Sequence, residues 1–315
     1  MSNKSKKSET DKRSKNINRN VVSQQIERFK VEQDCELLEF IVSKFPDRSR
    51  NKLKSWIKHK NIEVNNKPEV NPIYKLSSGD KIDVYPGRVF EGRKLKGISI
   101  VYEDDSLIVI YKPTGLLSVS ANKPSATAYS LLSDYIKAQN PKNRIFIVHR
   151  LDRETSGLMM FARNENVQQI LQDNWKEMVF ERKYIAVTAG VLNRPEGTIT
   201  SYLVENKAMT VYSTNDPDKG QLAITHYKTL NRRKPYTLME IVLETGRKNQ
   251  IRVHMSDLGH PIIGDKKYGS ADNPFNRIGL HAWILGFTHP ITGENIRLES
   301  DIPAEFLSLF RGWSI

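Results

Sequence analysis

The sequence predicts an α+β protein of two domains, and three observations carry this prediction. The length of 315 residues exceeds a typical domain of about 150 residues. Apolar residues at helical spacing alternate with short β segments before residue 180, whereas residues 182–244 are mostly segments of β alternation. Glycines and charges at 86–97 separate a small N-terminal part from a larger remainder. We therefore expect a mostly antiparallel mixed sheet with flanking helices and loops, joined to a small α+β domain.

Composition points to an anionic partner inside the cell. The chain carries 49 Lys+Arg against 36 Asp+Glu, a formal net charge of +13. Basic proteins gain affinity for nucleic acids by releasing phosphate counterions, so we expect a polyanionic partner. The single cysteine, Cys35, cannot form an internal disulfide, and no Cys/His cluster has zinc-ligand spacing. No apolar run approaches the ~18 residues of a membrane span, and no signal peptide is seen, so a cytoplasmic protein is expected.

Residues 1–33 are polar and rich in basic side chains. Such a segment buries too little apolar surface to offset the entropy of ordering, so we expect a disordered basic tail. A solubilising role and nonspecific affinity for RNA are both open.

Residues 34–86 have the pattern of a small folded domain. Pro46 is expected to end a first helix, whose apolar members are Leu37, Leu38, Ile41, Val42 and Phe45. Ser49 is expected to cap a second helix with Leu53, Trp56 and Ile57 on its apolar face. The other face is basic and contains no acid: Arg48, Arg50, Lys52, Lys54, Lys58 and Lys60. Short β segments at 62–64 and 81–84 follow.

This small domain resembles the S-four-type RNA-binding domain. The matching segments are Ser49-Arg50, Ile62-Glu63-Val64-Asn65-Asn66 and Gly79-Asp80-Lys81-Ile82. The family usually has Gly at the position of Asn66, a mild departure because Asn tolerates a left-handed turn. The resemblance implies RNA binding through the basic helix, with Arg50 and Lys54 as contacts. The alternative is a small α+β unit whose basic face is merely solvated.

Residues 87–97 read as a linker, and residues 98–315 as the larger domain. Its first strands are expected at 98–102 and 107–111, followed by a turn that carries Lys112. Helices are expected around 131–136 and over 167–178, the latter capped by Asn164. The β segments that follow are 182–187, 198–204, 222–230 and 236–244, with a loop at 206–220. A helix opened by 245–254 precedes Gly259, and the chain ends in an amphipathic segment at 306–310.

A dense polar cluster between two apolar runs is the main candidate for chemistry. Residues 145–148 and 158–162 are apolar, and between them lie His149, Arg150, Asp152, Arg153 and Glu154. A charged loop between buried strands is where a rigid scaffold presents functional side chains. The alternative for such a loop alone is a solvated connector with an Arg–carboxylate pair of little energetic weight.

Four separated segments together resemble the RluA-type pseudouridine synthases. They are Lys112-Pro113-Thr114-Gly115-Leu116, the string from His149 to Leu158, Arg182-Lys183-Tyr184, and the string from Thr245 to His254. Supporting matches are Gly264-Asp265…Tyr268-Gly269 and Leu280-His281-Ala282. The similarity covers nearly all of 98–312 and implies the fold of a pseudouridine synthase catalytic domain.

The resemblance assigns roles to individual residues. Asp152 becomes the catalytic carboxylate, acting as nucleophile or charge stabiliser at the sugar carbon. Arg252 is its partner, and a nearby Arg favours the ionised carboxylate. Tyr184 contacts the base and assists proton removal, and Arg150 fills the gap left when the nucleotide flips out of its stack. We also count Lys112 among the substrate-binding residues.

Each of these roles has a plainer alternative. Asp152 alone could be an Arg-paired loop acid, Tyr184 could pack in a strand, and Arg252 could form a helix-surface salt bridge. Arg150 could contact a phosphate instead. Three histidines, His149, His254 and His281, are expected to be structural, and Glu154 a solvated loop residue. The clear departure from the family is Asn249 in place of the usual His, which we expect to alter local support rather than activity.

The expected protein is therefore an RNA-modifying isomerase that needs no cofactor and no metal. Its partner is structured RNA, ribosomal rather than transfer RNA, with no role for DNA or a membrane, and a monomer is expected. Three alternatives remain: a non-catalytic RNA-binding or ribosome assembly factor, a synthase directed at transfer RNA, and a nucleoside hydrolase or glycosidase. The last would need a second placed carboxylate or a metal site.

Overall fold

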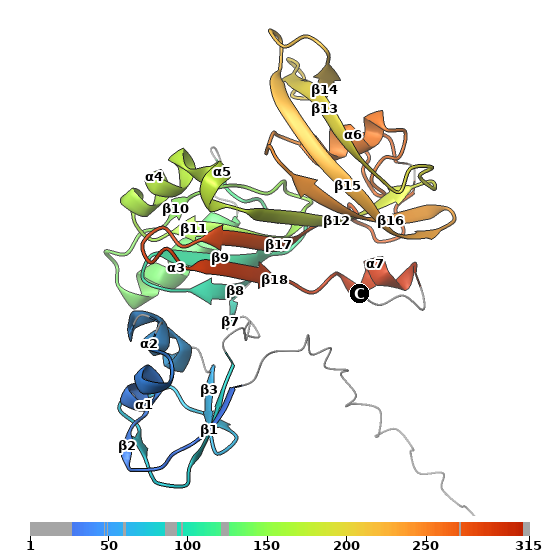
Figure 1. Cartoon of the computed structure of the whole chain (residues 1–315). Helices are drawn as coiled ribbons and strands as arrows, with labels where there is room; N and C mark the ends of the chain where they lie inside the picture. Colours follow the sequence, from blue (N-terminus) through green and yellow to red (C-terminus); the bar gives the residue numbers. More distant parts are fainter. Residues whose placement is uncertain are drawn as a thin grey trace, which may run out of the picture. The chain divides into compact units, whose positions relative to one another are not determined.

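The computed structural model describes residues 27–46, 48, 50–58, 61–85, 93–95, 97–120, 126–270 and 272–310 (Figure 1). The chain divides into two compact units, Met1–Arg88 and Val89–Ile315. This division falls inside the segment predicted as a linker. Among the described residues, no helix is long and apolar enough to span a membrane.

The first unit packs two helices against a small sheet. The helices are α1 (Leu37–Lys44) and α2 (Arg50–Lys58). The sheet has the order β1-β6-β3-β4, all antiparallel, built from Glu27–Lys30, Lys81–Val84, Ile62–Val64 and Lys67–Pro68, and β2 (Cys35–Glu36) pairs with β5 (Lys75–Leu76). The apolar members of both helices share one core with the alternate residues Ile82 and Val84 of β6. This burial is what the helical spacing of the sequence predicts.

The predicted tail ends too late in the chain. Strand β1 lies within residues 1–33 and pairs with β6 along its whole length. Phe29 packs against the core of the unit, and Val31 is buried. Pairing and burial together offset the entropy of ordering this segment. Residues 1–26, the predicted cap Ser49, Lys60 and the side chains of Lys52 and Lys58 lie outside what the structure describes.

The second unit is built on one large sheet. Its order is β14-β13-β15-β16-β12-β17-β11-β9-β8-β7, with β10 beside β11 and β18 beside β17. Every described pairing is antiparallel except that of β11 with β17. The strands are β7 (Arg93–Leu95), β8 (Ile98–Glu103), β9 (Leu107–Lys112), β10 (Phe146–Ile147), β11 (Ser156–Ala162), β12 (Glu181–Ala189), β13 (Glu196–Glu205), β14 (Val211–Thr214), β15 (Gln221–Arg233), β16 (Tyr236–Leu243), β17 (Leu280–Thr288) and β18 (Asn295–Glu299). The predicted mostly antiparallel mixed sheet of an α+β protein is confirmed.

Helices cover both faces of this sheet. On one face, α3 (Ala128–Gln139) and α6 (Gln250–Asp257) share a core with the strand residues Ile108, Ile110 and Met159. On the other face, α4 (Glu165–Asp173) packs on Val109 and Met160, the neighbours of those residues in the chain. Successive strand residues point to opposite faces, so the apolar runs 107–110 of β9 and 158–162 of β11 serve both cores. The helix α7 (Ala304–Ser308) packs on a further cluster around Ile185 and Trp283.

Two predicted segments differ from the structure. The helix expected over 167–178 is two helices, because α4 ends at Asp173 and α5 (Trp175–Met178) begins after Asn174. The loop expected at 206–220 contains β14, which pairs with β13 and buries Val211. Four residues are too short for a β pattern to stand out among polar neighbours.

Candidate active site

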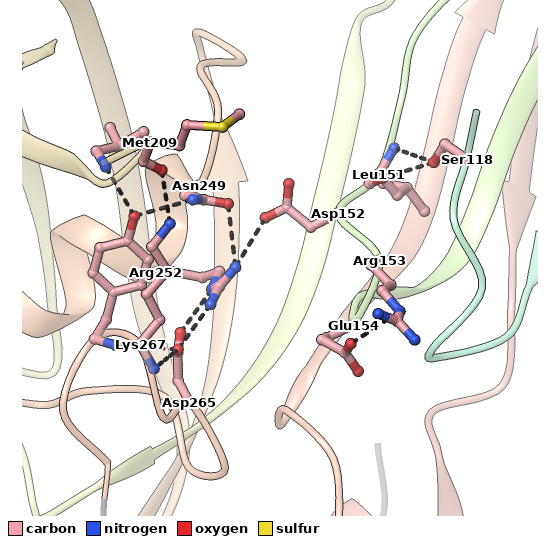
Figure 2. Close-up of polar contacts among 12 residues, drawn as sticks. Ser118, Leu151, Asp152, Arg153, Glu154, Met209, Asn249, Arg252, Asp265 and Lys267 are labelled. Carbon is pink, nitrogen blue, oxygen red and sulfur yellow. Dashed lines mark hydrogen bonds and ion pairs between the residues drawn. The ribbon is translucent and has the colours of Figure 1, made fainter. Parts of the chain in front are cut away.

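The polar loop that carries Asp152 is fastened to the segment after β9. Ser118 Oγ donates to the carbonyl of Leu151 at 2.6 Å and accepts from its N–H at 3.1 Å (Figure 2). Thr114 Oγ1 donates to the carbonyl of Glu154 at 2.7 Å. These bonds link residues that are 33 and 40 positions apart in the sequence, so the loop conformation depends on the tertiary fold. The two strands that enter and leave the loop, β10 and β11, pair with one another.

Lys112 fastens the loop from within the core, and its predicted contact with the substrate stays a prediction. The side chain is completely buried, and its Nζ donates to the carbonyls of Pro113, Leu116 and Arg153 at 3.0, 2.7 and 3.1 Å. All three ammonium donors are thereby used. Burial lowers the pKa of Lys112 to about 8, so the group is still mostly protonated near neutral pH.

The Thr-Ser-Gly string and the Leu-His-Ala string form one structural element. Strand β11 runs parallel to β17, with Ser156 opposite His281 and Gly157 opposite Ala282. The backbones approach so closely that a Cβ at Gly157 would lie 2.1 Å from the Ala282 carbonyl oxygen, and φ is +117°. Only glycine fits here. The close pairing of these two distant motifs therefore accounts for the glycine in the first of them.

The two predicted catalytic groups, Asp152 and Arg252, face one another. Arg252 Nη1 lies 3.6 Å from Asp152 Oδ2 (Figure 2). A third residue, Asp265, binds the same guanidinium more closely, with 2.7 Å to Nε and 2.8 Å to Nη2. Asp265 is completely buried and also accepts from the backbone N–H of Lys267 and Tyr268. Burial disfavours the charged form of Arg252, but the hydrogen bonds and charge of Asp265 outweigh it and raise the pKa of the guanidinium.

Asn249, the departure from the family pattern, supports the same arginine. It precedes α6 in the left-handed conformation, with φ of 55°. Its Oδ1 accepts from Arg252 Nη1 at 3.2 Å, and its Nδ2 donates to Tyr268 Oη at 3.0 Å (Figure 2). The ring of Tyr268 in turn lies under the guanidinium, 5.0 Å from its carbon to the ring centroid. Asn is among the residues that best tolerate this backbone conformation, so it meets both the backbone and the hydrogen-bonding requirement.

A pocket gathers most of the predicted residues. Arg150, Asp152, Tyr184 and Arg252 all line it. Tyr184 reaches it from β12 and is mostly buried, and Arg182 Nη2 lies 3.4 Å from its hydroxyl. The structure thus brings together the three predicted catalytic residues and the predicted flipping residue, whose chemical roles remain predictions. Arg50 and Lys54 are exposed on α2 of the first unit, where Arg50 is paired with Glu39.

The histidines expected to be structural are held in hydrogen-bond networks. Arg277 donates to Ser156 Oγ, whose hydroxyl contacts His281 Nδ1 at 2.8 Å, and His281 Nε2 contacts Ser300 Oγ at 2.8 Å. Ser300 donates onward to a carbonyl, so His281 donates through Nε2 and accepts through Nδ1. Burial and the charge of Arg277 lower the pKa of His281 to about 3, which keeps the ring neutral.

His254 fits the same expectation, whereas His149 is bonded through one ring nitrogen and its buried Nδ1 has no hydrogen-bond partner in the described part of the protein. Glu154 is solvated as predicted. His149 Nε2 accepts from the N–H of Met160 at 3.0 Å, and burial lowers the pKa of His149 to about 3. His254 lies between Thr225 and Ser201, at 2.8 and 3.0 Å. The side chain of Glu154 is 42% exposed and has a long contact of 3.6 Å to Arg153. It is therefore poorly suited to act as a second buried acid.

Sequence reasoning missed two residues of the site. Asp265 was only part of a supporting match, and the sequence signal was the acid directly after Gly264; the structure shows that this glycine has a φ of +75° and that Asp265 is buried. Gln250 is the other, a buried residue at the start of α6. Its Oε1 accepts from Thr245 Oγ1 and from the N–H of Arg247, and its Nε2 donates to the carbonyl of Ile224. Among the described residues no group of three or more His, Cys, Asp or Glu could hold a metal ion.

Comparisons with known proteins identify the family of this chain. Residues 106–257 match the family model described as RNA pseudouridylate synthase. The chain is 35% identical over 293 residues to the uncharacterized RNA pseudouridine synthase YlyB of Bacillus subtilis (strain 168). The aligned region covers 88% of this chain and 94% of the relative. The chain belongs to the RluA-type RNA pseudouridine synthases.

This synthase is also similar to a second bacterial protein and to a solved human structure. It is 33% identical over 284 residues to the ribosomal large subunit pseudouridine synthase D of Pasteurella multocida (strain Pm70), covering 84% of this chain and 87% of that one. The solved structure of human RNA pseudouridylate synthase domain containing 4 superposes with a TM-score of 0.56 at 25% identity, over 67% of this synthase and 92% of that chain. Its relatives are RNA pseudouridine synthases, so the synthase is an isomerase acting on RNA.

Proposed function

We propose that this synthase converts uridines of large-subunit ribosomal RNA to pseudouridine, with Asp152 as the catalytic carboxylate. The observation that carries the proposal is the ion-paired Asp152 in a pocket that also contains Tyr184 and Arg252. The ribosomal target is supported by relatives named ribosomal large subunit pseudouridine synthase D in three bacteria, at 33% identity. Transfer RNA is the alternative substrate.

The reaction is an isomerisation that needs no other reactant. The bond from N1 of uracil to C1′ of ribose breaks, the base turns, and a bond from C5 to C1′ forms. The proton on C5 leaves and N1 takes up a proton, so atoms and charge balance. Asp152 attacks the sugar carbon or stabilises the positive charge that develops on it. Arg252 orients the carboxylate and opposes its negative charge until the substrate charge forms.

The remaining pocket residues handle the base and the RNA. Tyr184 contacts the uracil ring and assists removal of the C5 proton. Arg150 is exposed at the rim and, among the described residues, has no ion pair, so it is free to enter the stack that the flipped uridine leaves. The flip is required because the atoms that exchange are inaccessible in a helix.

The first unit binds RNA as an S-four-type domain in this proposal. Its two helices and small antiparallel sheet support the resemblance, and α2 exposes Arg50 and Lys54. The ion pair of Arg50 with Glu39 is exposed on both sides, so a phosphate can replace the carboxylate at little cost.

Pseudouridine mapping with matched carboxylate variants tests the proposal. Wild type, Asp152→Asn, Asp152→Ala and the neighbouring control Glu154→Gln are incubated with transcribed large-subunit ribosomal RNA. We expect pseudouridine from wild type and Glu154→Gln, and none above background from both Asp152 variants. Equal activity of wild type and Asp152→Ala would refute the catalytic assignment. Modification of transfer RNA alone would refute the ribosomal target.

The same assay separates the other functions. A non-catalytic assembly factor binds ribosomal RNA without forming pseudouridine. A nucleoside hydrolase or glycosidase releases free uracil, which chromatography of the reaction detects. We expect bound RNA, new pseudouridine and no free uracil.

A further inference from the structure

A groove adjoins the pocket that contains Asp152, and the two share part of their lining. It runs between the residues before Asp152, helix α5 and the turn before α6, and its volume is about 590 Å³. The residues common to groove and pocket are Arg150, Arg182, Gly246 and Arg247. A flipped uridine stays linked to both neighbours through phosphates, so the RNA strand has to leave the pocket over its rim. Three of the four shared residues are cationic.

Arg182 is held in place at this shared wall. Its Nη2 lies 3.4 Å from the hydroxyl of Tyr184 in the pocket, and its guanidinium carbon lies 5.4 Å from the centroid of the Trp175 ring in the groove. A Cβ at Gly246 would lie 3.0 Å from Arg182 Nη1, so the glycine leaves room for the guanidinium. The group is therefore oriented before any ligand arrives, which lowers the entropic cost of binding.

The charge of Arg182 lacks an acidic partner in the described part of the chain. Asp173, Glu177 and Glu244 also line the groove, but none lies within ion-pair distance of Arg150, Arg182 or Arg247 there. Glu244 contacts His226 at 3.1 Å, and Asp173 accepts from Gln169. Arg182 is partly buried, so it loses hydration without gaining a carboxylate in return. An anionic ligand would supply the missing partner.

We propose that this groove binds the phosphodiester flanking the flipped uridine, with Arg182 as its main contact. The inference rests on the proposed function, because it takes the pocket to hold a uridine of RNA. The planar fork of a guanidinium matches two oxygens of a phosphate, and Trp175 and Tyr184 hold that fork at the junction of groove and pocket. Arg150 and Arg247 add positive charge on the same wall. Arg182 thereby positions the strand relative to Asp152.

Kinetics across a range of salt concentrations test the phosphate contact. The variants are Arg182→Gln, Arg182→Lys and the control Arg194→Gln, which removes an exposed charge lining neither hollow. The substrate is total RNA from cells that lack this protein, so the test does not depend on which RNA is modified. We expect Arg182→Gln to raise KM roughly 10- to 100-fold and to reduce the slope of log KM against log salt by about 0.7 to 0.9, the loss of one phosphate contact. Arg182→Lys keeps the slope, and Arg194→Gln changes neither quantity.

A neutral backbone linkage shows whether a flanking phosphate is the ligand. Oligonucleotides containing the mapped uridine carry a single methylphosphonate on its 5′ or its 3′ side. We expect one of the two to raise the KM of wild type about as much as Arg182→Gln does, and to add nothing further to the KM of that variant. Additive losses at both linkages, or a wild-type KM and salt slope for Arg182→Gln, would overturn the inference. If wild type modifies transfer RNA only, the ribosomal proposal fails, and the same comparison on that RNA still decides the role of Arg182.

Discussion

Arg252 makes its short contacts with Asp265 and only a long one with Asp152. Two bonds of 2.7 and 2.8 Å join the guanidinium to Asp265, whereas 3.6 Å separates it from Asp152. Because Asp265 is completely buried and binds in a bidentate manner, it fixes the guanidinium independently of the substrate. The long contact leaves the Asp152 carboxylate available for the substrate while it stays opposite a positive charge.

We therefore expect Asp265→Asn to impair catalysis without abolishing RNA binding. An amide offers one acceptor in place of two and no charge, so the guanidinium shifts, and misplacement near the reacting atoms costs on the order of 100-fold in rate. The unfolding free energy falls by about 3 kcal/mol because a buried pair loses one charge. Single-turnover pseudouridine formation, measured below the unfolding transition, checks this. Asp272→Asn, an exposed acid of the same loop, serves as control, and a wild-type rate for Asp265→Asn would contradict the positioning role.

Replacement of Asn249 separates its backbone role from its hydrogen bonds. Asn249→Ala removes the bonds to Arg252 and Tyr268 and puts a less suitable residue in the left-handed conformation. We expect roughly tenfold lower kcat/KM and a loss of about 1 to 2 kcal/mol of stability. Asn249→His restores the usual family residue and keeps activity within a few-fold of wild type. If alanine and histidine behave alike, the hydrogen bonds of Asn249 do not support Arg252.

Lys112→Met tests whether the buried lysine fastens the catalytic loop. The substitution deprives the carbonyls of Pro113, Leu116 and Arg153 of their donor. Each lost hydrogen bond to the charged ammonium costs about 1.5 to 3 kcal/mol, so we expect at least about 3 kcal/mol less stability and a large drop in kcat. Urea unfolding and RNA binding measure the two roles separately, with the exposed Lys142→Met as control. Weaker RNA binding with unchanged stability would support the substrate role that the sequence predicted.

The buried histidines make the folded state sensitive to acid. The folded pKa of His281 is about 3, because of burial and the charge of Arg277, whereas an unfolded histidine titrates near 6.5. Between these values the unfolded chain holds a proton that the folded chain lacks, so the unfolding free energy falls as the pH drops from about 6.5 toward 3. His149 acts in the same direction.

Urea unfolding between pH 7.5 and 4.5 measures this dependence. We expect His281→Asn to be less stable than wild type at pH 7.5 and to lose less stability on acidification, by up to about 1.4 kcal/mol per pH unit. His226→Asn, at a partly exposed position, should follow the wild-type curve. A wild-type slope for His281→Asn would show that this histidine is not the acid-sensitive group.

Much of the fold could be predicted because the relevant forces are local. The spacing of apolar residues in α1 and α3 and the Asn164 cap of α4 depend on near neighbours in the chain, and these elements lie where the pattern indicates. Strands β1 and β14 could not be predicted in this way. Each has only four residues, and what orders them is pairing with β6 and β13, which polar composition does not reveal.

The sequence by itself determined the α+β class and the family, and it selected Asp152, Tyr184 and Arg252 as candidates. These depend on residue type and order, which the chain displays directly. Only the tertiary structure decided that Lys112 is buried beneath the loop and that Asp265 holds Arg252. Lysine is usually exposed, and an acid 13 positions beyond an arginine has no local reason to meet it. Burial and distant pairing arise only when the sheet assembles, so the support of the predicted catalytic residues is a property of the fold.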